Sequence, residues 1–269
     1  MMQYIIDFWN QFGWLANLLQ IISALFAVFL FFKYVIIRAF KRHEIKKFKS
    51  VTSYIKNKLG HNDDVLQEII KNSNVAIIDD DLDDFPIDYL KKIGIDPDTY
   101  ESVSLSEINK FLKYDVLLLD ITGVVEEDMQ NGGLEFMRRL KAKESSPAVI
   151  AVSSKTFDPT KTEFFRLADD TMDKPISETE CEESIINILR ETKSPCTAAE
   201  KIDSLLYASE ISHDDQEKFR NILIRHLEGD VSDLKFNKKI SKYFWQIDRS
   251  DLMRNVEIIL HTMEVIDAK

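Results

Sequence analysis

The chain has 269 residues, of which 45% are apolar and 30% charged, and this ordinary globular composition excludes disordered, collagen-like and disulfide-scaffold classes. At roughly 150 residues per domain, this length predicts about two folded units. The net charge of −11 is unevenly spread, with −1 on residues 1–32, +8 on residues 33–58 and −18 on residues 59–269, and so acidic a body repels phosphate backbones and excludes a nucleic-acid partner.

The first predicted element is a transmembrane helix over residues 12–32, which hold no charged side chain. At 1.5 Å rise per residue, a helix of this length spans about 30 Å, the thickness of the hydrocarbon core of a bilayer. The basic residues follow the apolar run, whereas in a cleavable signal peptide they precede it. The positive-inside rule then predicts a single-pass protein of the inner membrane, with a short N-terminus outside and residues 33–269 in the cytoplasm.

Polar residues within the span leave two interpretations open. Asn17, Gln20 and Ser23 recur every three residues on one broad face. Polar side chains in hydrocarbon favour a partner helix, which would make a homodimer, but three uncharged polar residues are also tolerated in a lone span. Residues 39–58 predict a basic juxtamembrane helix, for which contact with anionic membrane lipid is the physical expectation.

Between residues 74 and 189, short β-rich runs alternate with amphipathic helical patterns. This alternation predicts an α/β fold with a doubly wound, five-stranded parallel sheet and helices on both faces. The continuous apolar runs VAII and VLLL are typical of strands buried on both sides. The predicted strands are 74–78, 101–104, 115–119, 148–152 and 170–173. The predicted helices are 86–93, 106–113, 133–143, 159–168 and 178–190.

Polar and charged side chains follow several of these strands. Asp79 and Asp80 end the first strand, and Asp120 ends the third. Ser153 ends the fourth, and Lys174 follows the fifth. Because the carboxyl ends of parallel strands meet at one edge, these groups are expected to share a crevice. Carboxylates so close repel one another unless a cation neutralises them, and oxygen ligands with open positions suit Mg²⁺.

One carboxylate beside the metal would be placed to attack a phosphoryl donor and form an aspartyl phosphate. The hydroxyl and the ammonium would then hold the phosphoryl oxygens. By contrast, Asp83, Asp84, Glu126, Glu127 and Asp128 are interpreted as solvated acids without a role.

The segments AIIDDD, VLLLD, VIAVSS and DKPI, in this order, resemble the receiver domain of two-component response regulators over residues 73–193. The resemblance implies that Asp79 and Asp80 hold Mg²⁺ together with Asp120. It also implies that Asp120 is the phospho-acceptor and that Thr122 lends its backbone carbonyl to the metal.

The same resemblance implies that Ser153 occupies the position of the switch hydroxyl and Lys174 that of the phosphate-binding lysine. The peptide Lys174–Pro175 resembles the family's cis bond. A receiver is not an enzyme in its own right; a histidine kinase or phosphotransfer protein would supply the phosphoryl group, and output would be a protein–protein interaction.

The sequence departs from the family pattern in the parts that carry output. Val124 replaces the usual proline four residues after the acceptor, and Gly132-Gly133 replaces the usual Asp-Gly. The loop after Asp120 is longer than usual. Thr171 stands where the family has its aromatic switch, so the resemblance implies an altered output coupling more than a loss of phosphorylation.

Two alternatives remain open. One is a pseudo-receiver that no longer accepts phosphate and acts as a scaffold or membrane effector. The other follows from the segment Asp120 to Val124, which resembles the DxDGT-type motif of haloacid dehalogenase phosphatases. In that interpretation Ser153 is the hydroxyl and Asp169-Asp170 the late acid pair, although Thr122 replaces the acid/base aspartate.

The tail shows helical apolar periodicity over residues 198–209, 215–228, 231–246 and 249–265, which predicts a small helical bundle or an extension packed on the receiver. It carries no helix-turn-helix signature and no basic recognition surface, so transcriptional output is not expected. His226 lies in RHLEG, which resembles a phosphotransfer segment with Glu228 in place of the lysine; we interpret it as a structural residue on a helix face.

Two cysteines far apart in sequence, Cys181 and Cys196, predict reduced thiols. The predicted organisation has four parts: an N-terminal segment with the span (1–40), a basic juxtamembrane helix and linker (41–72), a receiver-like domain (73–193) and a C-terminal helical region (194–269).

Overall fold

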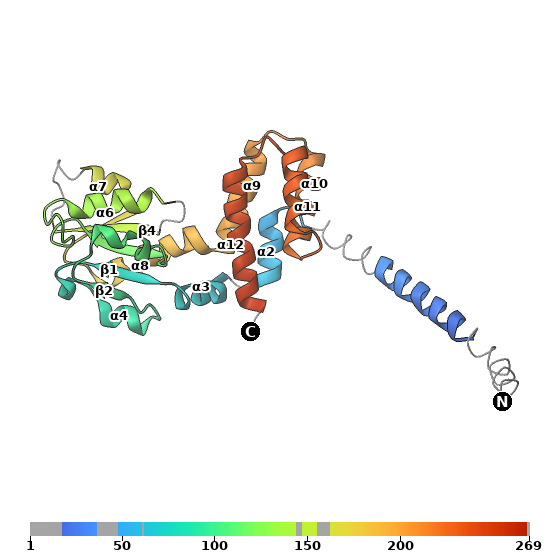
Figure 1. The fold of residues 1–269 in the computed structure, drawn as a ribbon, viewed down its shortest axis with the longest axis horizontal. Coiled ribbons are helices and arrows are strands. Elements are labelled where there is room, and N and C mark those ends of the chain that lie inside the picture. The colour runs from blue at the N-terminus through green and yellow to red at the C-terminus, as the bar shows by residue number, and fades with distance from the viewer. Residues whose placement is uncertain (1–17, 37–47, 61, 144–146, 155–161, 268–269) are drawn as a thin grey trace, which may run out of the picture.

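The structure is a computed structural model that describes residues 18–36, 48–60, 62–143, 147–154 and 162–267 (Figure 1). Its first described helix, Leu18–Ile36, is long and apolar enough to cross a membrane, and none of its side chains is buried against the rest of the chain. The predicted span of 12–32 overlaps this helix, which continues through Tyr34 to Ile36. Residues 12–17 of that prediction lie outside the described residues.

The five-stranded parallel sheet predicted from the alternating pattern is confirmed, with strand order β2-β1-β3-β4-β5. This order is that of the flavodoxin-like doubly wound fold, whose topological switch point lies between β1 and β3. The strands are β1 (Val75–Ile78), β2 (Asp98–Tyr100), β3 (Val116–Asp120), β4 (Ala148–Ser153) and β5 (Asp170–Asp173).

Helices cover both faces of the sheet because successive strand residues point to opposite sides. Ile77, Leu118 and Ile150 point into a core shared with α3, α4 and α8. Ala76 and Leu117 point into a second core shared with α5, α6 and α7. These helices are α3 (Asn62–Lys71), α4 (Ile87–Lys92), α5 (Ile108–Phe111), α6 (Gly132–Lys141), α7 (Thr162–Leu167) and α8 (Glu178–Lys193), with short 3-10 turns η1 (Leu82–Asp84) and η2 (Leu105–Glu107).

The position predicted for the second strand, 101–104, is wrong. The strand is Asp98–Tyr100, at the edge of the sheet, and its first two residues are exposed. Its polar residues lack the apolar run that marks the central strands, since one edge of β2 faces solvent. Val103, which lies in the predicted range, forms only an isolated bridge with Val125.

The tail forms a helical bundle, and the four predicted tail helices are present with small shifts of their ends. They are α9 (Pro195–Ala208), α10 (His213–Leu227), α11 (Asp233–Tyr243) and α12 (Arg249–Asp267). Their buried side chains form a third core, separate from the two cores of the sheet unit. Figure 1 shows this bundle beside the sheet unit, with α9 and α12 next to α8 and with α10 and α11 on the far side.

Helix α2 (Val51–Leu59) belongs to this bundle, since Val51, Tyr54 and Ile55 lie in its core. Asp203 of α9 accepts hydrogen bonds from the backbone amides of Val51 and Thr52, each at 2.9 Å, and from the Thr52 hydroxyl at 2.7 Å. The N-terminus of α2 is therefore capped by a carboxylate that lies about 150 residues away in sequence.

Two lysines of the predicted juxtamembrane helix also face the tail. Lys56 pairs with Glu200 at 3.3 Å and Lys58 with Glu228 at 3.4 Å. The part of that predicted helix before Phe48 lies outside the described residues. All buried core residues lie between Val51 and Met263, so a fragment that begins at Phe48 keeps all three cores intact.

Candidate functional site

The sheet brings the predicted site residues to one edge. Asp120 is the last residue of β3 and pairs in register with Val152, and Asp79 directly follows β1. Ser153 ends β4 opposite Asp173, and Lys174 follows β5. In a parallel sheet these are all carboxyl ends, and they flank the switch point between β1 and β3.

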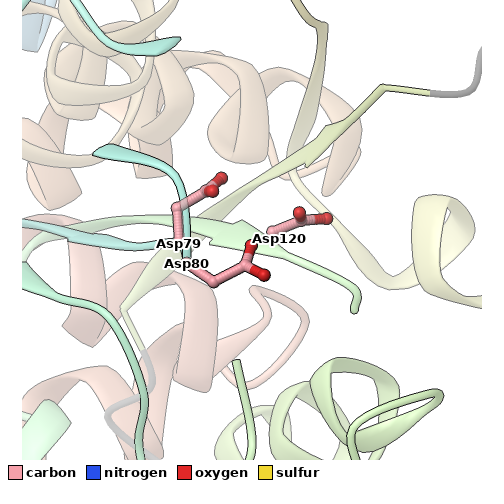
Figure 2. A group of neighbouring side chains, drawn as sticks. All are labelled: Asp79, Asp80 and Asp120. Carbon is pink, nitrogen blue, oxygen red and sulfur yellow. The ribbon is translucent and has the colours of Figure 1, made fainter. Parts of the chain in front are cut away.

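Three carboxylates meet there. Asp79, Asp80 and Asp120 each offer an oxygen, and these three oxygens lie within 4.8 Å of one another. Asp79 is fully buried and Asp120 is 6% exposed, whereas Asp80 is exposed. Figure 2 shows the three side chains reaching into one space beyond the strand ends. The cluster is thus open to solvent on the side of Asp80.

Lys174 lies among these acids with only 8% of its side chain exposed. Its Nζ donates to Asp79 Oδ1 at 2.7 Å and lies 3.5 Å from Asp120 Oδ2. Burial alone would lower the pKa of Lys174, but the hydrogen bond to Asp79 and the charges of Asp79 and Asp120 outweigh it and raise the pKa. The ammonium therefore stays charged.

Burial acts in the opposite sense on Asp79 and raises the pKa of its carboxyl group. The hydrogen bonds from Lys174 and from the Asp81 amide lower this pKa, but burial outweighs them. One oxygen of this buried carboxylate, Oδ2, has no hydrogen-bond partner among the described residues. A buried acceptor without a partner costs free energy unless a cation or a bound water completes it. Carboxylate oxygens are the ligands that Mg²⁺ prefers, so this donor set fits a divalent cation.

The structure corrects the interpretation of Asp84 as a solvated acid without a role. Its Oδ2 lies 3.3 Å from Lys174 Nζ, and the side chain is 35% exposed. The residue lies in η1, directly after the acidic end of β1. No local pattern distinguishes it from Asp83, because the turn alone decides which acid faces the lysine.

Two other acids interpreted as solvated hold the long loop after Asp120. Glu127 accepts hydrogen bonds from the Ser104 hydroxyl and the Leu105 amide, which lower its pKa. Asp128 accepts from the amides of Gln130 and Asn131, and these bonds lower its pKa too. The loop is therefore fixed to η2 on one side and to the start of α6 on the other.

Glycines in this loop allow close approach to the acids, which the sequence analysis missed. Gly123 has φ of +79°, and a Cβ there would lie 2.4 Å from Asp80 Oδ2. At Gly133 a Cβ would lie 2.6 Å from the carbonyl oxygen of Asp120. A glycine three residues after a strand-end aspartate is the signal that could have revealed the first of these.

The other predicted residues lie at or near the same edge. Ser153 is buried, and its carbonyl accepts from the Lys174 amide at 3.0 Å. Thr122 is partly exposed in the loop after Asp120, and Thr171 is exposed on β5. The peptide between Lys174 and Pro175 is cis.

The acid pair that the phosphatase interpretation requires lies elsewhere. Asp169 accepts from the amide of Val149 near the start of β4, and Asp170 is the first residue of β5 and accepts from the Ser184 hydroxyl. Both lie at the amino end of their strand, opposite the edge that carries Asp120. The structure does not bring them to the acceptor.

His226 also lies away from the acids, in the bundle. It is buried, its ring stacks on Phe236 with centroids 4.2 Å apart, and its Nδ1 lies 2.9 Å from the carbonyl oxygen of Val231. These contacts give it a packing role in the bundle core.

No protein-family model matches the chain, and no curated protein matches it. Similar solved structures include the BeF3-activated DrrB receiver domain, with 20% sequence identity, a TM-score of 0.36, and coverage of 44% of this chain and 97% of that one. A two-component response regulator from Clostridium difficile has 21% identity, a TM-score of 0.38, and coverage of 46% and 100%. The N-terminal domain of a response regulator receiver protein from Methanoculleus marisnigri has 24% identity, a TM-score of 0.31, and coverage of 44% and 97%. These structures belong to the family that the motif order resembles.

Proposed function

We propose that the sheet unit is a phospho-acceptor of the receiver type, with Asp120 as the accepting residue. The observation that carries this proposal is the meeting of Asp79, Asp80 and Asp120 with the buried ammonium of Lys174 at one open edge of the sheet. Paired acids and a lysine at the carboxyl ends of parallel strands suit the binding of a phosphoryl group.

In the proposed reaction a carboxylate oxygen of Asp120 attacks the phosphorus of a phosphohistidine on a partner kinase or phosphotransfer protein. The new O–P bond forms as the P–N bond breaks, and the imidazole leaves with the electron pair and takes up a proton. Lys174, 3.5 Å from Asp120 Oδ2, would hold an oxygen of the transferred group. Ser153 is proposed as the hydroxyl that responds to the new charge.

Mg²⁺ would be held by Asp79, Asp80 and Asp120, with the Thr122 carbonyl as the further ligand implied by the resemblance, and when bound it would neutralise charge on the phosphoryl oxygens. The chain's own residues prepare this site. Burial of Asp79 and Asp120 keeps their charges in a medium of low dielectric, where electrostatic interactions are strong.

We further propose that the helix Leu18–Ile36 anchors the protein in the inner membrane as a single span, with the sheet unit and the bundle in the cytoplasm. Output would be a protein–protein interaction, with altered coupling because Thr171 stands where the family has its aromatic switch. A homodimer through the span remains one interpretation of its polar face. One alternative is a scaffold that accepts no phosphate. The other is a phosphatase, although the late acid pair that it requires lies at the opposite edge of the sheet.

The proposal is tested with the fragment 48–269, which keeps all three cores. Incubation with acetyl phosphate and Mg²⁺ should add one phosphoryl group, detected by intact mass, and the Asp120→Asn variant should stay unmodified. Asp83→Asn is the matched control, because it removes an exposed acid close to the site without touching Lys174.

A folded fragment that takes up no phosphoryl group would overturn the proposal and favour the scaffold. Repeated turnover of small phosphate monoesters would instead favour the phosphatase. EDTA should abolish labelling if a divalent cation is required, and labelling that persists in EDTA would contradict the metal part of the proposal.

A further inference from the structure

Helix α11 presents a local basic surface on an otherwise acidic body, although no basic surface was expected from the sequence of the tail. Phe236 and Ile240 are buried and fix the face that packs in the bundle. At 100° per residue, Leu234, Lys238 and Lys242 fall on the opposite side, and all three are exposed. Lys235 is exposed beside them, so one helix face carries an apolar side chain and three ammonium groups.

Exposed apolar and aromatic side chains lie at the start and just beyond the end of this helix. Leu234 is 86% exposed at the start of α11, and Tyr243 ends the helix with 58% exposed. Trp245 follows two residues later and is 75% exposed. Exposed tryptophan and tyrosine beside lysine are typical of surfaces that lie at a membrane–water interface, where aromatic rings rest at the level of the headgroups.

The lysines of this surface have no acid partner in the part of the chain that the structure describes. Among the residues that the structure describes, none of Lys235, Lys238 and Lys242 lies within 4.0 Å of a carboxylate oxygen. In the same bundle, Lys56 and Lys58 are paired with glutamates. Residues 59–269 carry −18 in total and as a whole repel an anionic surface, but a local cluster of unpaired lysines is complementary to one from outside the chain.

The bundle is held close to the apolar N-terminal helix. Even when fully extended, the chain between Ile36 and Phe48 would be only about 40 Å long. Phe48 packs against the bundle core. Helices α10 and α11 form the side of the bundle away from the sheet unit, so the sheet unit does not cover the α11 surface (Figure 1). A tether of this length gives a weak lipid contact an effective concentration in the millimolar range.

We propose that the surface formed by Leu234, Lys235, Lys238, Lys242, Tyr243 and Trp245, here called the α11 surface, binds an anionic lipid bilayer. The lysines contact headgroup phosphates, and the exposed leucine and aromatic side chains enter the interface. The bundle thereby lies against the membrane, and the sheet unit with Asp120 stays turned toward the cytoplasm. This inference rests on the proposed membrane anchor for its setting, but its test does not require the span.

Fragment 48–269 contains Trp245 as its sole tryptophan, because the other two are Trp9 and Trp14. Addition of phosphatidylcholine vesicles with phosphatidylglycerol should shift its emission to the blue, and brominated lipid should quench it. Pure phosphatidylcholine vesicles should produce neither change. High salt should weaken binding, since the Debye length shrinks.

The variant Lys235→Gln, Lys238→Gln, Lys242→Gln should lose about fivefold in partitioning per lysine, and therefore about a hundredfold in total. The control variant Lys91→Gln, Lys92→Gln, Lys110→Gln removes the same charge from exposed positions of the sheet unit and should bind as the parent does. Circular dichroism checks that both variants fold.

No emission shift at millimolar anionic lipid would overturn the proposal, because the tether supplies no higher concentration than this. Equal losses in the two triple variants would also overturn it and show that only net charge matters. Acetyl phosphate labelling of Asp120 in the same samples separates the two proposals, since neither lysine set touches the acid cluster.

Discussion

Lys174 is the one cation that the described part of the chain places within 4.0 Å of Asp79 or Asp120. It also reaches Asp84, so a single positive charge faces three carboxylates, with Asp80 close by. Such a site is short of positive charge, and the remaining repulsion favours a divalent cation at the open side. The ammonium therefore holds the cluster together in the absence of metal and is available to an incoming phosphoryl group.

Removal of this ammonium should destabilise the sheet unit. The variant Lys174→Met keeps the length of the side chain but leaves Asp79 buried without its partner, and we expect a loss of about 3 kcal/mol in the free energy of unfolding. Urea denaturation measures this loss, and Mg²⁺ should restore part of it.

Lys193→Met is the control for that variant. Its ammonium pairs with Asp115 at 2.6 Å but is 44% exposed, so its removal should cost less than about 1 kcal/mol. Equal losses in the two lysine variants, or no effect of Mg²⁺ on Lys174→Met, would contradict this account of the cluster.

A second prediction at the scale of residues concerns Gly123. The variant Gly123→Ala places a methyl group 2.4 Å from Asp80 Oδ2 and must displace that carboxylate. Gly94→Ala is a matched control, because Gly94 also has positive φ but has no atom within 4 Å of its Cβ position. Both variants should lose about 1 kcal/mol of stability from backbone strain, but only Gly123→Ala should weaken Mg²⁺ binding, measured by calorimetry. Loss of metal binding in both would show that the contact with Asp80 is unimportant.

At the scale of elements, the capping of α2 by Asp203 joins the part of the chain directly before the sheet unit to the C-terminal bundle. The variant Asp203→Ala removes the carboxylate that accepts three hydrogen bonds at the start of α2. We expect a loss of about 1–2 kcal/mol and faster amide exchange in α2. Hydrogen exchange read by mass spectrometry measures the effect helix by helix.

Glu200→Ala is the control, because Glu200 lies on α9 as Asp203 does. The ion pair of Glu200 with Lys56 is more than half exposed and should contribute little. If α2 exchanges as slowly in Asp203→Ala as in the parent, its packing in the core holds it without the cap.

The central strands and the acid cluster were predictable from sequence because both depend on local patterns. Continuous apolar runs mark β1, β3 and β4, and the acids of the cluster directly follow β1 or end β3. The edge strand β2 was misplaced because its polar residues carry no such run. The partner of α2 was not predictable at all, since Asp203 is one of many acids and only the tertiary fold brings it to Val51. Asp84 was missed because no local pattern distinguishes it from Asp83, and the turn decides which of the two faces Lys174.

At the scale of the whole molecule, the two cysteines lie in two different hydrophobic cores. Cys181 lies in a core of the sheet unit and Cys196 in the bundle core. Burial raises the pKa of both thiols, that of Cys181 to about 12. The folded-state pKa of Cys181 thus lies above the value of an unfolded thiol. The contribution of this buried thiol to the stability of the fold is complete below about pH 8.5. It falls as the pH rises toward 12, because over this range only the thiol of the unfolded chain ionises.

Each thiol should therefore react with a disulfide reagent near pH 8 only when its own core opens, and mass spectrometry can follow the two sites separately. Asp203→Ala should speed labelling of Cys196 about tenfold, as expected for a loss of 1.4 kcal/mol, and should leave Cys181 nearly unchanged. Lys174→Met should speed labelling of Cys181 and spare Cys196.

The helix α8 is joined to α9 through Ser194 alone, and α12 also packs on α8, so the two units have a route of coupling. If each variant instead speeds both thiols equally, the sheet unit and the bundle open together, and a charge added at Asp120 would then also affect the stability of the bundle.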